Sequence, residues 1–208
     1  MPSPDNPPGN QQRALLRQQV RSRRRAVSRR VRRAAAASLA RRIPRIMAYS
    51  RARWVAAYLP FDGEINLRPL IQAGVNAGKR FCLPMIDRRR PGTMNLGYFN
   101  QRTTLLPDRW GILEPHQRST MRVPLQQIDV VLLPLVAFDL AGNRLGMGAG
   151  YYDRLLQHRS VQSWRRPVLI GVAFETQKVE KLFAESWDVA LDWVVTEKHI
   201  YRMQTKSN

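Results

Sequence analysis

Residues 130–154 read VVLLPLVAFDLAGNRLGMGAGYYDR, and this stretch predicts the fold. Its first part, Val130–Phe138, is short, apolar and rich in β-branched side chains, which is typical of a strand buried in a parallel sheet. Asp139–Gly142 has the composition of a tight turn, and a helix is expected over residues 151–158. We therefore expect a strand, a loop and a helix in succession, as in α/β folds.

The loop between that strand and that helix has the composition of a phosphate-binding site. Gly146, Gly148 and Gly150 lack a Cβ atom, so successive backbone N–H groups can approach phosphate oxygens near the start of the helix. Arg144 offers a fork of donors suited to phosphate, and Asp153 is placed to reach a Mg²⁺ ion on the same phosphates. The spacing matches neither the Walker loop nor the dinucleotide fingerprint, so spacing alone also allows a glycine-rich turn without a ligand.

Strand-like and helix-like segments alternate along the chain. Further strands are expected over residues 53–60, 80–85, 94–99, 168–174 and 192–196, and a helix over residues 67–77. This order predicts a single-domain α/β layered sandwich with a mostly parallel central sheet, preceded by basic N-terminal helices. We expect residues 1–10, with four prolines, to be a disordered lead-in, residues 11–200 to form the domain, and residues 201–208 to be a C-terminal tail.

The formal net charge of +20 is concentrated in the first 53 residues, which hold fifteen arginines and one acidic residue. Apolar spacing predicts two helices there, with Ser28 as N-cap of the second. One face of the first helix carries Arg13, Arg17, Arg21 and Arg24. Phosphate contact is the functional interpretation for the first two. For the other arginines we expect a solvated face, with attraction of polyanionic ligands or non-specific RNA binding as alternatives.

Composition excludes several function classes. Cys82 is the only cysteine, so a disulfide or a Cys-based zinc site is impossible within one chain, and we expect a buried thiol. The three histidines have no metal-ligand spacing, and no nucleophile elbow is present. No segment is long and apolar enough to span a membrane. We expect a cytoplasmic monomer, and set aside a mitochondrial transit peptide because the phosphate-binding arginines begin at Arg13.

The glycine-loop segment resembles the signature of the 5-formyltetrahydrofolate cyclo-ligases, also called 5,10-methenyltetrahydrofolate synthetases. That signature, P-x-x-x-F-D-x-x-G-x-R-L-G-x-G-x-G-[YF]-Y-D-R, is matched from Pro134 to Arg154. The resemblance extends over most of the chain, through YLPFDGEINLRPLI, KRFCLPMI, RWGILEP and GVAFETQKVEKLFAESWDVALDWVVTE. Only the first ten or so residues and the tail past Ile200 lie outside it.

The resemblance implies an enzyme that uses ATP and Mg²⁺ to cyclise 5-formyltetrahydrofolate, with or without a polyglutamate tail. ATP would phosphorylate the formyl oxygen, N10 would attack, and 5,10-methenyltetrahydrofolate, ADP and phosphate would be released. Two other classes stay open as alternatives. One is a non-catalytic RNA-binding or regulatory protein on the same fold, and the other is a different small-molecule kinase or ligase with the same phosphate loop.

The resemblance also implies the site residues. For ATP binding they are Arg13, Arg17, Arg144, Leu145, Gly146, Met147, Gly148, Ala149, Gly150, Tyr151 and Tyr152; for catalysis Arg144, Tyr151 and Asp153; for metal binding Asp153 and Asp188; and for substrate binding Leu59, Glu64, Trp110, Met147 and Tyr151. The family often has Lys where this chain has Arg13 and Ala149. We expect Arg144, Arg154 or an N-terminal arginine to supply the charge missing at position 149.

Overall fold

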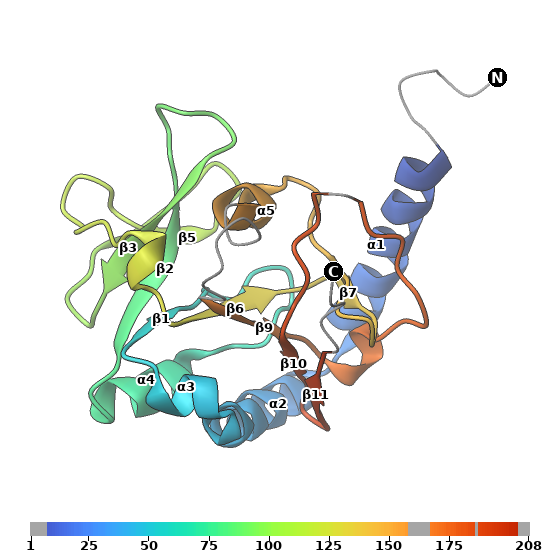
Figure 1. The fold of residues 1–208 in the computed structure, drawn as a ribbon, viewed down its shortest axis with the longest axis horizontal. Helices are drawn as coiled ribbons and strands as arrows, with labels where there is room; N and C mark the ends of the chain where they lie inside the picture. Colours follow the sequence, from blue (N-terminus) through green and yellow to red (C-terminus); the bar gives the residue numbers. More distant parts are fainter. Residues whose placement is uncertain (1–7, 158–166, 186, 204–208) are drawn as a thin grey trace.

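A computed structural model describes residues 8–157, 167–185 and 187–203 of the chain (Figure 1). Its helices are α1 (Pro8–Ala26), α2 (Arg29–Arg42), α3 (Met47–Arg51), α4 (Arg68–Asn76) and α5 (Tyr151–Leu156), with short 3-10 turns η1 (Ile43–Arg45), η2 (Leu125–Gln127) and η4 (Glu175–Gln177). Its strands are β1 (Trp54–Ala56), β2 (Arg80–Ile86), β3 (Met94–Phe99), β4 (Leu105–Pro107), β5 (Leu113–Pro115), β6 (Val130–Pro134), β7 (Ala137–Phe138), β8 (Arg144–Leu145), β9 (Val168–Val172), β10 (Trp193–Val195) and β11 (Ile200–Arg202).

The central sheet has seven strands in the order β11-β10-β9-β6-β1-β2-β3. The inner strands pair in parallel, and only the edge strands β3 and β11 are antiparallel to their neighbours. The expected α/β sandwich with a mostly parallel sheet is therefore confirmed. Two further hairpins, β4–β5 and β7–β8, lie outside this sheet.

Helices cover both faces of the sheet, with α2, α3 and α4 on one side and α5 on the other (Figure 1). Strand β6 shows why its sequence is continuously apolar. Val130 and Leu132 pack into the hydrophobic cluster that contains Leu39 of α2, whereas Val131 and Leu133 pack into the cluster on the opposite face. A central strand that is buried on both faces needs apolar side chains at every position.

The expected strand over Val130–Phe138 is in fact two strands. The chain leaves the central sheet after Pro134, and β7 pairs instead with β8 in a separate hairpin. At the break, the Leu135 carbonyl accepts hydrogen bonds from Arg24 Nη1 (3.0 Å) and Gln177 Nε2 (2.6 Å). Side chains therefore satisfy a buried backbone carbonyl that a continuous strand would have paired with its neighbour.

Both ends of the expected domain differ from the structure. Helix α1 begins at Pro8, inside the expected lead-in, while residues 1–7 lie outside the described part of the chain. Strand β11 continues to Arg202, beyond the expected boundary at residue 200, and Met203 is buried against the sheet. The expectation of a tail from residue 201 is therefore wrong for its first three residues.

Other local predictions are confirmed, with shorter elements than expected. The Ser28 side chain caps α2 by accepting the Val31 N–H at 3.4 Å, and Cys82 is a buried free thiol. Strand β1 covers only Trp54–Ala56 of the expected 53–60, and β9 ends at Val172 rather than 174. Helix α5 ends at Leu156, and residue 158 lies outside the described residues. Among the helices described, none has the length and apolar character needed to cross a membrane.

Candidate active site

A cavity of about 700 Å³ lies where β1, β2 and β6 end and the glycine loop begins. Its walls come from α1, the loop after β1, the β4–β5 hairpin, the glycine loop, and Glu185, Trp187 and Asp188. Parallel strands bring their carboxyl ends to one edge of a sheet, which explains why segments far apart in sequence meet here. The cavity is lined by all the predicted site residues except Leu145: Arg13, Arg17, Leu59, Glu64, Trp110, Arg144, Gly146, Met147, Gly148, Ala149, Gly150, Tyr151, Tyr152, Asp153 and Asp188.

Leu145 has a different place. Its side chain is 1% exposed and packs in a small hydrophobic cluster with Val20 of α1 and Val136 and Ala137 around β7. Its backbone pairs with Ala137 in the β7–β8 hairpin. Leu145 therefore anchors the start of the glycine loop to α1 and the body of the protein.

The glycine loop takes a backbone path that its glycines permit. Gly148 has a φ of +103° and Gly150 a φ of +66°, which side-chain-bearing residues rarely adopt. Arg17 Nε donates to the Gly146 carbonyl at 2.9 Å, so α1 holds one side of the loop. Arg154 donates to the Ala149 carbonyl of the loop and to the carbonyl of Gly92, each at 2.5 Å. Two arginines thus hold the loop, one at Gly146 and the other at Ala149.

Each acid predicted to bind metal is paired with an arginine. Arg144, which is only 7% exposed, donates to Asp153 and to the Val189 carbonyl. Arg13 Nη1 donates to Asp188 at 3.0 Å. Asp153 lies in the first turn of α5, as expected. In the ranges that the structure covers, no three His, Cys, Asp or Glu residues form a metal-binding group.

Arg17 differs from these two arginines because it donates to a backbone carbonyl and not to a carboxylate. Burial lowers the pKa of Arg17, the neighbouring Arg13 lowers it further, and Asp188 opposes both effects. A partly buried guanidinium whose charge is crowded by another arginine gains from an incoming anion. Arg17 is therefore well placed to meet the phosphates of a ligand.

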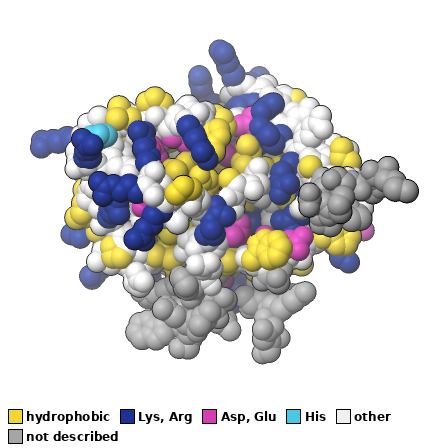
Figure 2. All heavy atoms as spheres, turned by 90° about the horizontal axis from the view of Figure 1, so that it is seen from above, with side chains coloured by type: hydrophobic (Ala, Val, Ile, Leu, Met, Phe, Trp, Pro, Cys, Tyr) yellow, Lys and Arg dark blue, Asp and Glu magenta, His cyan; other side chains and the backbone are white. Residues whose placement is uncertain are grey.

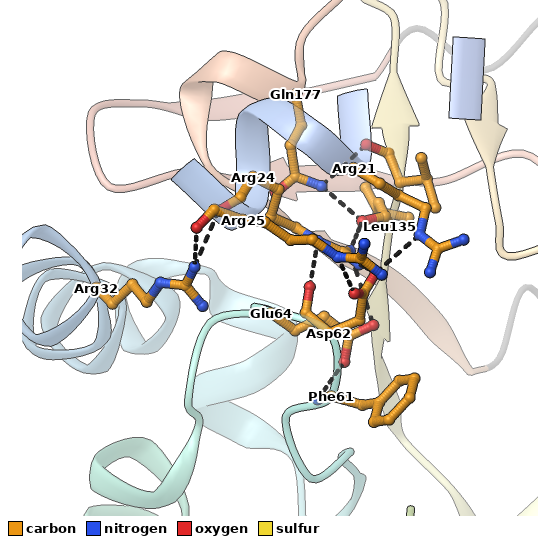
Figure 3. Close-up of polar contacts among 10 residues, drawn as sticks. Arg21, Arg24, Arg25, Arg32, Phe61, Asp62, Glu64, Leu135 and Gln177 are labelled. Atoms are coloured by element: carbon orange, nitrogen blue, oxygen red, sulfur yellow. Dashed lines mark hydrogen bonds and ion pairs between the residues drawn. The ribbon is translucent and has the colours of Figure 1, made fainter. Parts of the chain in front are cut away.

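One wall of the cavity is formed by the loop after β1 and carries Glu64, whose contacts with Phe61 and Arg24 are drawn in Figure 3. The Glu64 side chain is 10% exposed and accepts the Phe61 N–H at 3.0 Å. Burial raises the pKa of Glu64 to about 7, against the hydrogen bond from Phe61 and the attraction of Arg24. Burial also raises the pKa of the neighbouring Tyr58 and Tyr152 hydroxyls. This wall can offer a carboxyl group whose protonation changes near neutral pH.

Trp110 lies in the turn of the β4–β5 hairpin and packs edge to face on Tyr151 with ring centroids 6.0 Å apart. Arg109 stacks on the Trp110 ring, its Cζ atom 3.9 Å from the centroid, and donates to the Tyr151 hydroxyl at 3.4 Å. Trp110 is still 43% exposed, so one part of its ring is accessible to a planar ligand.

The sequence did not reveal two groups near the cavity. Glu114 is 5% exposed, lines the cavity and accepts the Ile86 N–H at 2.7 Å; burial raises its pKa. Its only sequence signal is an acid between Leu113 and Pro115. The second group is Asp62 with Arg21, Arg24 and Arg25. No sequence pattern indicated this cluster, since the arginines lie about forty positions before Asp62.

The expectation of a solvated arginine face is wrong for Arg24. Its side chain is 1% exposed and binds Asp62, as do Arg21 and Arg25. Many other arginines of the first 53 residues are exposed, among them Arg23, Arg29, Arg30, Arg33, Arg41, Arg45, Arg51 and Arg53. In the face shown in Figure 2, Lys and Arg side chains are dispersed, with hydrophobic side chains between them.

The fold and the cavity define an α/β protein with an enzyme-like site, in which a glycine loop, arginines and a buried carboxyl group line one cavity. Residues 9–197 match the model of the 5-formyltetrahydrofolate cyclo-ligase family, and the chain belongs to this family.

Relatives and solved structures agree with this assignment. The chain is 40% identical to the 5-formyltetrahydrofolate cyclo-ligase of Escherichia coli K12 over 71% of this chain and 79% of that protein. It is 38% identical to the same enzyme of Haemophilus influenzae over 66% of this chain and 72% of that protein. The NMR structure of Aquifex aeolicus 5,10-methenyltetrahydrofolate synthetase superposes with a TM-score of 0.79 at 31% identity, covering 94% of this chain and 95% of that one.

Proposed function

We propose that ATP drives the cyclisation of 5-formyltetrahydrofolate to 5,10-methenyltetrahydrofolate in this cavity. The chain is an enzyme of the cyclo-ligase family. One observation carries the proposal of the site: the glycine loop with Arg13, Arg17 and Arg144 lines the same cavity as Leu59, Glu64 and Trp110. A nucleotide on the first set of residues and a folate on the second would meet inside one cavity.

The chemistry requires activation of a formamide. Its carbonyl carbon is a weak electrophile, and its oxygen is a poor leaving group. Transfer of the γ-phosphoryl group from ATP to the formyl oxygen gives ADP and a carbon that N10 can attack. Attack by N10, with loss of its proton, closes the ring, and departure of phosphate then forms the C=N bond of the methenyl product. Such a transfer asks the protein mainly for positioning and for charge stabilisation.

The residues of the cavity suit these tasks. Arg17 and the backbone N–H groups of the glycine loop would hold the phosphates, and Arg144 and Tyr151 would face the transferred group. Glu64 would accept hydrogen bonds from the pterin side of the folate, while Trp110 and Met147 cover its ring system. The aromatic packing of Trp110 on Tyr151 would help to exclude water from the reacting atoms.

Asp153 and Asp188 suit a magnesium ion only together with phosphate oxygens. Mg²⁺ commonly takes one or two protein carboxylates and completes its coordination with phosphate and water, and both acids line this cavity. When bound, the ion would neutralise phosphate charge. Arg144 and Arg13, now paired with these acids, would then be available to the nucleotide.

Arg17 is the best candidate to supply the charge that a lysine at position 149 would bring. Arg144 is paired with Asp153, and Arg154, which is not part of the cavity lining, binds the backbone carbonyls of Ala149 and Gly92. Arg17 lines the cavity, and its guanidinium carbon lies 3.6 Å from where a Cβ on Gly148 would stand. We therefore assign the compensating role to Arg17.

The reaction is tested by the near-ultraviolet absorbance of the conjugated methenyl product, measured with purified protein, 5-formyltetrahydrofolate and Mg-ATP. We expect an absorbance rise that requires both ATP and Mg²⁺. ATP hydrolysis without this rise would favour a kinase or ligase with another acceptor. Neither hydrolysis nor an absorbance rise, together with steeply salt-dependent RNA binding, would favour the non-catalytic alternative.

A further inference from the structure

Three arginines of α1 converge on a single carboxylate, that of Asp62 (Figure 3). Arg24 Nη2 lies 2.7 Å and Arg21 Nε 2.8 Å from Asp62 Oδ2, and Arg25 Nε bonds the other oxygen. Arg24 Nε also donates to the Asp62 carbonyl at 3.1 Å. Both partners in the central pair are buried, since Arg24 is 1% and Asp62 5% exposed at the side chain.

The loop that carries Asp62 has a backbone that needs external support. Asp62 has a φ of +48°, the single non-glycine residue with positive φ in the described ranges, and Gly63 follows with +82°. A Cβ on Gly63 would stand 2.7 Å from Arg32 Nη1 of α2. A left-handed conformation is unfavourable for a non-glycine residue, and the arginine contacts offset that cost.

The Asp62 loop continues into the wall of the cavity that is proposed to bind folate, called the folate wall below. Glu64 is two residues after Asp62, and Arg24 Nη1 approaches Glu64 Oε1 to 3.8 Å while donating to the Leu135 carbonyl at 3.0 Å. Leu135 and Glu64 both line the cavity. The single buried guanidinium of Arg24 therefore fixes the positions of the Asp62 loop, Glu64 and the end of β6 relative to one another.

The same helix reaches the phosphate side of the cavity. Arg13 and Arg17 lie on α1 about 16 Å and 10 Å from Arg24 along the helix axis, at 1.5 Å per residue. They bind Asp188 and the Gly146 carbonyl. Helix α1 thus contacts the glycine loop through Arg17, and through Arg24 it contacts the loop that carries Asp62 and Glu64.

We propose that Arg24 and Asp62 are positioning residues that couple the two substrate sites through α1. The coupling rests on the proposed function, because it presumes nucleotide at Arg17 and folate at Glu64. Nucleotide that fixes the first half of α1 also fixes the Asp62 loop and Glu64, so folate binds to an ordered wall. By thermodynamic linkage, folate raises nucleotide affinity by the same factor.

The test measures the affinity of adenylyl imidodiphosphate, an ATP analogue that resists transfer, with and without saturating 5-formyltetrahydrofolate. In the wild type we expect folate to tighten nucleotide binding at least about fivefold, and Asp62→Asn to reduce this factor below about twofold. Nucleotide affinity without folate should change little, because Asp62 is not part of the cavity lining.

Two further variants keep the test decisive. Arg25→Gln removes one contact to Asp62 from a side chain that is 58% exposed, and it should lower the coupling factor even if Asp62→Asn does not fold. Arg23→Gln removes the same charge from an exposed position of the same helix and should keep the wild-type factor. A folded Asp62→Asn or Arg25→Gln protein with full coupling would overturn the proposal.

Measurements of product formation and of coupling on the wild-type protein distinguish this proposal from the proposed function. Formation of methenyl product without any coupling would refute the role of Arg24 and Asp62 and leave the cyclo-ligase reaction standing. Absence of product from folded protein would refute the reaction itself, and the coupling with it.

Discussion

Arg17 on α1 donates its Nε–H to the Gly146 carbonyl, 2.9 Å away and 129 residues later in the chain. This bond joins the basic N-terminal helix to the glycine loop and directs a guanidinium into the cavity. The arginine-rich start of the chain is thus part of the candidate active site.

Arg17 and position 149 should be interchangeable sources of charge. Arg17→Ala should raise the KM for ATP at least about tenfold, on the scale of one lost charged hydrogen bond. In an Ala149→Lys background the same change should cost less, because the new ammonium neutralises the same phosphates. Steady-state kinetics of the four proteins measure this non-additivity. Equal losses in both backgrounds would assign the compensating charge to another arginine.

Loss of the Arg144–Asp153 pair should strongly reduce turnover. Arg144→Ala or Asp153→Ala should lower kcat by at least about a hundredfold, the scale of a lost electrostatic contact in the transition state. Thermal unfolding must accompany the assay, since Arg144 is buried. Glu180→Gln, at an exposed position, serves as a control for loss of an acidic charge. Near-normal activity in either folded alanine variant would contradict these roles.

Glu64→Gln should affect folate more than ATP. Because Glu64 is one of the lining residues proposed to hold the folate, the KM for 5-formyltetrahydrofolate should rise by about tenfold or more, as expected for a lost hydrogen bond to a charged group. The KM for ATP should stay within about twofold when it is measured at saturating folate. Equal increases in both constants would mean that the substitution disturbs the fold and not the folate wall.

Stability should depend on pH through Glu64. Its pKa is about 7 in the folded protein, mainly because of burial, and about 4.3 in an unfolded chain. The folded state therefore holds the proton more tightly, and ionisation costs stability progressively as pH rises from about 4 to about 7. Relative to Glu64→Gln, the wild type should lose on the order of 3 kcal/mol across this range. Denaturant unfolding of both proteins at pH 4, 6 and 8 measures the difference between their free energies of unfolding. A difference that does not change with pH would contradict the raised pKa of Glu64.

The glycine loop should distinguish Gly148 from Gly146. Gly148→Ala forces an alanine to a φ of +103° and should cost about 1–2 kcal/mol of stability. Gly146 has no such φ and nothing within 4 Å of an added Cβ, so Gly146→Ala should unfold at nearly the wild-type temperature. Thermal denaturation of both variants makes the comparison. Equal stability would mean that the loop relaxes around Gly148.

Local sequence patterns predicted most of the fold because its central strands are buried on both faces. The apolar run of β6 and the cap at Ser28 are examples in which nearby residues determine the structure. The end of β6 was not predictable in this way, because it depends on Arg24 and Gln177 reaching the Leu135 carbonyl from distant segments. Strand β11 was missed because its three residues carry little pattern of their own.

The candidate site shows the same division. The glycine loop is contiguous in sequence, and family resemblance supplied Arg13, Glu64 and Asp188, which now line one cavity. Periodicity placed Arg24 on the correct helix face but could not show that this face is covered by the Asp62 loop. A run of charged residues is predicted to be solvated, because its sequence does not show which distant segments each side chain contacts in the folded protein.

The path of the formyl oxygen tests the central claim most directly. We would supply 5-formyltetrahydrofolate labelled with ¹⁸O in the formyl group and analyse the released phosphate by mass spectrometry after one round of ATP-dependent cyclisation. If the oxygen is phosphorylated and then leaves, the label appears in phosphate, one atom for each methenyl group formed. Label that appears in water, with unlabelled phosphate, would contradict phosphorylation of the formyl oxygen in this cavity.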